Sequence, residues 1–181
     1  VLESLGIEPS VWHVNEGHAS LALVERLSKA ISAGMSHDLA VDQIRSSTIF
    51  TLHTPVPAGN EVFDSDLVAR YLHGRLPGVD DDTLGALGHS GRDGIFDLGA
   101  LAIRLSRATN GVSARHGEVV TRDWEHIIGG PGTSVTNGVH IPTWVGGAMG
   151  RRIAEALGPE WTEMGLDADA WDAVRELDGD Q

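Results

Sequence analysis

The chain of 181 residues is long enough for one domain or a large part of one, contains no cysteine and carries a formal net charge of −13. Its acidic residues are spread along the chain, and their field repels polyphosphate backbones, which argues against nucleic acid as a partner. No stretch approaches the roughly 18 uninterrupted apolar residues of a membrane span, and the first residues do not resemble an export signal, so composition favours a cytoplasmic protein without a membrane partner.

The first predicted strand covers residues 11–14, and a helix over 21–31 follows it. Leucine, valine and isoleucine recur at helical spacing within that helix, while charged residues occupy its other face. The polar segment HVNEGH, residues 13–18, lies between the two elements. It therefore occupies the junction of a strand with a helix.

Three interpretations of this junction stay open from the residues alone. His13, Glu16 and His18 could bind a metal ion, but a helical metal pair needs histidines four apart, and these are five apart with a glycine between them. The segment could be a hydrogen-bonded turn without a ligand. It could also bind a polyol, because imidazole, amide and carboxylate groups donate to and accept from hydroxyls.

The second predicted strand, residues 47–52, ends in His53 and Thr54. Two prolines and a glycine within 55–60 exclude a regular element, so this segment is predicted to be a loop. An isolated histidine at a strand end is most often structural. A rigid loop that presents a His-Thr pair at a sheet edge nevertheless favours a functional role.

Later elements follow from the same signals. A helix is predicted over 64–75, with Asp64 and Ser65 suited to its N-cap, and Ser113 is suited to cap a helix that runs toward Trp124. His116 in that helix is interpreted as a surface or capping residue. Residues 78–94 are predicted to be an irregular segment with a short helix. Further helices are predicted over 98–107, 145–157 and 167–177. A third strand is predicted to end at 110–112, and a fourth to cover 133–136, just before Asn137.

Strands that alternate with helices predict an α/β fold with a mainly parallel sheet. Ligands of such sheets bind beyond the carboxyl ends of the strands. The clusters of histidine, asparagine and glutamate all follow predicted strands. One shared cleft at that edge of the sheet is therefore expected.

Four segments taken together in chain order carry a family resemblance. They are HVNEGHASLALVERL, TIFTLHTPVPAGNEVF, LAIRLSRATNGVSARHGEV and TSVTNGVHIPTW. The chain resembles the α-glucan phosphorylases (glycogen, starch and maltodextrin phosphorylases), and is most similar to their shorter bacterial branch. The resemblance implies an internal fragment of a two-domain, Rossmann-like glycosyltransferase fold of the GT-B type. Residues 1–144 would be the latter part of the N-terminal sugar-binding domain, and 145–181 a helical segment leading towards the cofactor-binding domain.

The resemblance also implies an activity and its residues. The family transfers a terminal glucosyl unit from α-1,4-glucan to phosphate with retention, releasing glucose 1-phosphate. His53 would be the catalytic residue: it would bond the transferred glucose near its 6-hydroxyl and help to stabilise the oxocarbenium ion through its neighbouring backbone. Asn137 would hold the same sugar from another side. Glu16, His18 and Thr54 would line the pocket.

The family carries pyridoxal phosphate on a lysine of its second domain. Lys29 is the only lysine of this chain and lies on the polar side of a predicted helix. No residue of this chain is therefore assigned to the cofactor, and none to a metal. The chain by itself is expected to be inactive and to need the remainder of the enzyme.

The implied partners are α-glucan or maltodextrin and inorganic phosphate, and the resemblance leaves room for a homo-oligomer. Two alternatives stay open beside it. One is a module that binds maltodextrin without catalysis. The other is a metal-dependent hydrolase that uses His13, Glu16 and His18.

Overall fold

The computed structural model describes residues 1–164, 169 and 171–176. Contacts divide the chain into two compact units, Val1–Asn137 and Gly138–Gln181. The domain boundary expected after residue 144 stays a prediction.

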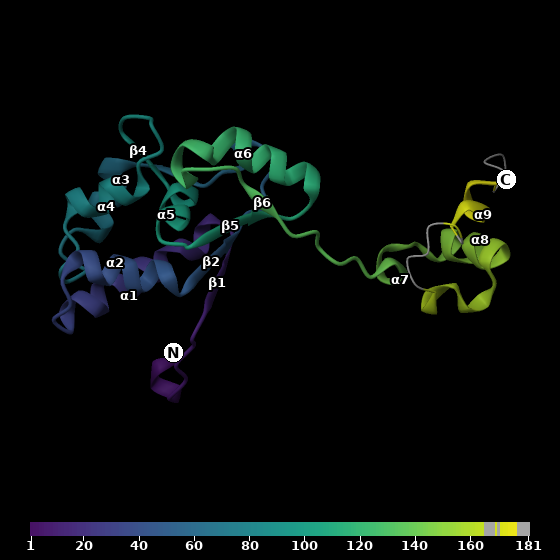
Figure 1. Ribbon diagram of the computed structural model, residues 1–181, viewed down its shortest axis with the longest axis horizontal. Coiled ribbons are helices and arrows are strands. Elements are labelled where there is room, and N and C mark those ends of the chain that lie inside the picture. The colour runs from purple at the N-terminus through teal and green to yellow at the C-terminus, as the bar shows by residue number, and fades with distance from the viewer. Residues whose placement is uncertain (165–168, 170, 177–181) are drawn as a thin grey trace. The chain divides into compact units, whose positions relative to one another are not determined.

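The first unit is built on a parallel sheet of four strands in the order β1-β2-β5-β6 (Figure 1). This confirms the α/β fold with a parallel sheet that the alternation of elements predicts. The sheet forms because alternate strand residues such as Val14 and Phe50 are buried beneath helices. The strands are β1 (Trp12–Asn15), β2 (Thr48–Thr51), β5 (Ala108–Gly111) and β6 (Thr133–Ser134).

Helices α1 (Leu21–Ser32) and α6 (Ala114–Ile128) confirm two predicted elements. α1 buries Leu23, Val24 and Leu27 in the core, as its spacing predicts. Ser113 caps α6 by accepting the N–H of His116 at 3.1 Å. Three short 3₁₀ turns complete this part of the chain: Glu3–Leu5, Gly17–Ser20 and Pro57–Gly59.

Helix α2 (His37–Ser46) is absent from the sequence prediction, and α5 (Leu98–Arg104) ends earlier than the predicted residue 107. α2 escapes prediction because only Ala40 and Ile44 of its residues are buried. α5 ends early because the chain joins the sheet at once: Arg107 donates its N–H to the Thr48 carbonyl at 3.0 Å.

A small antiparallel pair, β3 (Val62–Asp64) with β4 (Ile95–Asp97), was also not predicted. All of β3 is exposed, so its sequence has no alternation of apolar and polar residues to indicate a strand. The pair encloses α3 (Ser65–Leu72) and α4 (Asp81–Gly88), the short helix of the predicted excursion. Asp64 caps α3 by accepting the N–H of Asp66, as predicted.

The second unit contains α7 (Ile141–Trp144), α8 (Gly147–Leu157), a 3₁₀ turn (Pro159–Glu163) and α9 (Asp172–Arg175). Helix α8 confirms the helix predicted over 145–157. Of the helix predicted over 167–177, α9 is found, while residues 167, 168, 170 and 177 lie outside the described residues. Within the described residues, no helix combines the length and the apolar character that crossing a bilayer requires.

Asp97 is a buried carboxylate, 2% exposed, that caps α5. Its Oδ1 accepts the N–H groups of Gly99 at 2.9 Å and Ala100 at 3.2 Å. Burial raises the pKa of Asp97, and these backbone donors and Arg92 offset only part of that effect.

Asp97→Asn should therefore change how stability depends on pH. A carboxyl group whose pKa is raised in the folded state contributes stability below its unfolded pKa, and this is lost as pH rises through the folded pKa. The wild type should thus lose stability relative to Asp97→Asn as pH increases from about 4 towards neutrality. Urea denaturation of both proteins across that range measures it, and parallel pH profiles would contradict the prediction. Asp97→Ala, which also loses the cap, should be about 1–2 kcal/mol less stable than wild type.

Candidate functional site

The carboxyl ends of the strands carry a row of polar residues. Asn15 lies in register with Thr51, Thr51 with Asn110, and Asn110 with Thr133. Parallel strands bring residues that are distant in the sequence to one edge of the sheet. The row therefore places the ends of β1, β2 and β5 side by side, with the short strand β6 beginning next to them, in agreement with the shared-cleft hypothesis.

A chain of side-chain hydrogen bonds crosses this row. The Thr51 hydroxyl donates to Oδ1 of Asn110 at 3.0 Å and lies 2.7 Å from Nε2 of His13. Because the threonine proton goes to Asn110, Nε2 of His13 must be the donor in the other bond. Through these two bonds the side chain of His13 links β1 to β2 and β5.

Glu16, directly after β1, has φ 63° and ψ 163°. It is the one non-glycine residue with positive φ in the described part of the chain, and this region of backbone space is almost restricted to glycine. Its N–H donates to the Thr51 carbonyl at 3.0 Å, which holds the strained residue beside β2. Strain of this kind costs about 1–3 kcal/mol and persists only where surrounding contacts impose it.

The carboxylate of Glu16 holds the loop that follows β2. Oε1 accepts the backbone N–H of His53 and, at 2.9 Å, that of Thr54. Oε2 accepts the Thr54 hydroxyl at 3.1 Å. Three donors from two consecutive residues thus converge on one carboxylate, which orients the His-Thr pair.

An open pocket of about 410 Å³ lies over this carboxylate. His53 contributes a side chain that is 36% exposed, with Nδ1 3.5 Å from Oε1 of Glu16. His18 stands on the rim, its Nδ1 3.6 Å from Glu61. The residues that line the pocket are Glu16, His18, His53, Thr54, Pro55, Gly59 and Glu61. The structure therefore brings together four of the five site residues named from the sequence.

Asn137, the fifth, does not line this pocket. It is exposed and donates its backbone N–H to the Val112 carbonyl at 3.1 Å. The segment after β6 therefore runs beside the residue that follows β5. Asn137 lies at the same carboxyl edge of the sheet as the other four.

His116, interpreted from the sequence as a surface or capping residue, instead supports the His-Thr loop from the interior. It is buried, 5% exposed, and its Nε2 lies 3.1 Å from the carbonyl oxygen of Thr54. Its Nδ1 accepts the N–H of Val112 at 3.3 Å, so Nε2 is the donor towards Thr54. The ring therefore holds the His-Thr loop from the side opposite Glu16. The sequence signal for this role is its position three residues after Ser113, in the first turn of a helix that follows a strand.

His116→Ala should lower the free energy of unfolding by about 2–4 kcal/mol, because it opens a cavity and leaves the Thr54 carbonyl and the Val112 N–H without partners. Chemical denaturation measures this change. His126→Ala, an exposed histidine of the same helix, is the matched control and should change stability by less than about 0.5 kcal/mol. Equal effects of the two substitutions would contradict the role given to His116.

No group of three histidine, aspartate or glutamate side chains that could hold a metal ion occurs among the described residues. His13 is bonded to Thr51, Glu16 to the His-Thr loop, and His18 lies near Glu61. The three residues of the metal-dependent hydrolase alternative thus face different partners. The described residues give that alternative no support.

Lys29 is unsuited to hold pyridoxal phosphate. Its side chain is 57% exposed, and Nζ lies 2.5 Å from Glu3 and 3.8 Å from Glu25. The hydrogen bond to Glu3 raises the pKa of Lys29, whereas a lysine that forms an imine with a carbonyl group must lose its proton. No residue described here therefore fits the attachment of that cofactor.

The fold and the position of the pocket define a class. A parallel α/β sheet with a pocket lined by polar groups beyond the carboxyl ends of its strands is typical of Rossmann-like folds. No family model matches the chain, but curated relatives do. Glycogen phosphorylase of Mycobacterium tuberculosis is 37% identical over 183 residues, with 93% of this chain covered. Maltodextrin phosphorylase of Thermococcus litoralis is 33% identical, and glycogen phosphorylase of Aquifex aeolicus 29% identical, each over 98% of this chain.

The chain is therefore homologous to a segment of the α-glucan phosphorylases, which confirms the family resemblance carried by its motifs. This homology also supports the GT-B type of fold. The chain spans 20% of the length of the M. tuberculosis relative, 22% of the T. litoralis relative and 27% of the A. aeolicus relative.

Proposed function

We propose that this chain supplies glucose-binding residues of an α-glucan phosphorylase, a glycosyltransferase that moves a terminal glucosyl unit from α-1,4-glucan to inorganic phosphate with retention. One observation carries the proposal. The pocket at the carboxyl edge of the sheet gathers Glu16, His18, His53 and Thr54, which the family resemblance assigns to the sugar. The names of the relatives, glycogen and maltodextrin phosphorylase, support the same substrate class.

The geometry suggests separate roles within the pocket. His53 is the catalytic residue, because its part-exposed imidazole faces the pocket while its backbone is held by Glu16. A hydroxyl-reading group discriminates best when its position is fixed beforehand. Glu16 acts mainly as a positioning residue, since its carboxylate already accepts three hydrogen bonds from the loop.

The remaining residues complete the sugar site. Thr54, His18 and Asn137 bind further hydroxyls: Thr54 beside His53, His18 from the rim, and Asn137 from the neighbouring strand end. The phosphate substrate and pyridoxal phosphate require groups outside the residues described here, because Lys29 does not fit the cofactor. Turnover is accordingly a property of the complete protein, and the chain alone is inactive. A cytoplasmic location and a homo-oligomeric state remain predictions.

The test is release of glucose 1-phosphate by the complete protein that carries this chain, supplied with maltodextrin, phosphate and pyridoxal phosphate. Phosphate-dependent release is expected. Absence of release with the cofactor bound would overturn the proposal. If such an inactive protein still bound maltodextrin, the binding-module alternative would replace it.

A further inference from the structure

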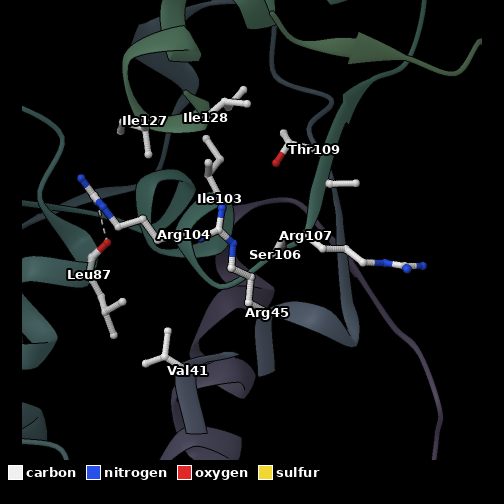
Figure 2. A pocket seen from close by; sticks show the side chains of 11 residues that line it. Val41, Arg45, Leu87, Ile103, Arg104, Ser106, Arg107, Thr109, Ile127 and Ile128 are labelled. Atoms are coloured by element: carbon white, nitrogen blue, oxygen red, sulfur yellow. Dashed lines mark hydrogen bonds between the residues drawn. The ribbon is translucent and has the colours of Figure 1, made fainter. Parts of the chain in front are cut away.

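A second pocket lies at the other edge of the sheet. Its volume is about 270 Å³, and it opens at the start of β5, between the ends of α2, α5 and α6 (Figure 2). The residues that follow β1 and β2 and line the glucose-binding pocket do not contribute to it. The strand β5 itself spans four residues, roughly 13 Å, from this edge of the sheet to the carboxyl edge.

Cationic side chains gather at this second pocket. Arg45 of α2 extends into it, towards Ile103, whereas Arg107 lies at its border with its side chain directed away from Arg45 (Figure 2). Arg104, the third, donates to the Leu87 carbonyl at 2.8 Å and keeps its other donors. Across the described residues, neither Arg45 nor Arg107 forms an ion pair with a carboxylate, although acidic residues outnumber Lys and Arg by 26 to 13 in this chain.

The wall of the pocket also contains a polar group in need of a partner. Ser106 is 4% exposed, and its hydroxyl is buried without a hydrogen-bond partner in the described structure. Buried hydroxyls are almost always satisfied, so a ligand oxygen or a water molecule is required nearby. The guanidinium group of Arg45 and this hydroxyl are both donors at the same pocket, and they suit an acceptor-rich, anionic group.

Most of the rest of the wall is apolar, with Thr109 as a further polar residue. Side chains of α2, α4, α5 and α6 provide the apolar part, namely Val41, Leu87, Ile103, Ile127 and Ile128. An inorganic ion would leave these surfaces in contact with water. A ligand with an anionic head and an uncharged body would satisfy the arginines and cover the apolar wall.

We propose that this pocket binds a small organic phosphate ester. A phosphate group suits Arg45, which extends into the pocket and has no carboxylate partner among the described residues, because a guanidinium group binds phosphate oxygens through paired, charge-assisted hydrogen bonds. In a chain of net charge −13, an anion can be held only where cations are concentrated locally. The location at the amino edge of the sheet makes this site distinct from the one proposed for glucose.

Phenyl phosphate is a suitable probe, and its binding to the complete protein can be followed by calorimetry. Arg45→Ala should weaken one class of sites by about tenfold to a hundredfold, the effect of losing a charge-assisted interaction. The affinity of Arg45→Lys for phenyl phosphate should lie between those of the wild type and Arg45→Ala, since lysine keeps the charge but loses the paired hydrogen-bond geometry. Arg70→Ala, an exposed arginine on α3, is the matched control and should bind like the wild type.

Two results would overturn the proposal. One is equal binding of phenyl phosphate to wild type and Arg45→Ala, and the other is equal affinity of the Arg45-dependent site for inorganic phosphate and phenyl phosphate. Absence of any binding would overturn it as well. Glucose 1-phosphate release is measured separately, so failure of this proposal is distinguishable from failure of the proposed function.

Discussion

His53→Ala in the complete protein is expected to lower kcat for phosphorolysis of maltodextrin by on the order of 10²–10³. The imidazole of His53 faces the pocket, and Glu16 fixes its backbone. Removal of one preorganised group from a site of developing charge typically has an effect of this size. The measurement is the rate of glucose 1-phosphate release at saturating maltodextrin and phosphate.

The control for this experiment is another histidine. His37 on α2 is part-exposed, bonds only its neighbour Asp38 at 3.2 Å among the described residues, and is absent from the pocket. His37→Ala should keep kcat within a factor of two of the wild type, about 0.4 kcal/mol in activation free energy. A loss of less than tenfold in His53→Ala would remove His53 from the catalytic role.

Replacing Glu16 is expected to separate activity from stability. Glu16→Ala and Glu16→Gly both remove the acceptor for three hydrogen bonds from the His53–Thr54 loop, so kcat should fall by roughly 10² in each, since small displacements of reacting groups have effects of this size. The two variants differ in the backbone. At φ 63° and ψ 163° alanine keeps the strain that glycine relieves.

Glu16→Gly should therefore be about 1–2 kcal/mol more stable than Glu16→Ala. This reverses the usual order of stability. A glycine variant is normally less stable than the alanine variant, because glycine gives the unfolded chain more conformational freedom. Urea denaturation of both proteins gives the comparison. If the alanine variant were the more stable, the strained conformation of Glu16 would be wrong. Glu16→Gln keeps one carbonyl oxygen as an acceptor and should retain an intermediate rate.

Elements that depend on neighbouring residues were predictable from the sequence. Helix α1 follows from the spacing of its buried apolar residues, and the caps Asp64 and Ser113 act on N–H groups two and three residues further on. The parallel sheet follows from the alternation of strands and helices. Its parallel order in turn predicts that the polar residues after the strands share one edge, and the structure brings Glu16, His18, His53 and Thr54 to one pocket there.

Features that depend on contacts between distant segments were decided only by the tertiary structure. His116 binds the carbonyl of Thr54 across 62 positions of sequence, and no local pattern distinguishes it from a surface histidine. The same applies to the arginine-lined pocket, where Arg45 meets residues of α5 and β5. Glu16 adopts a backbone conformation that its residue type disfavours, because Thr51, His53 and Thr54 hold it there.

The sequence by itself thus determined the fold class, the family resemblance and most residues of the pocket proposed to bind glucose, since periodicity, caps and strand ends are local signals. The tertiary structure decided which of these residues line the pocket and which hold the His-Thr loop. It also decided that Arg45 extends into a pocket without a carboxylate partner among the described residues, because hydrogen-bond partners and burial arise only when segments far apart in the chain pack together.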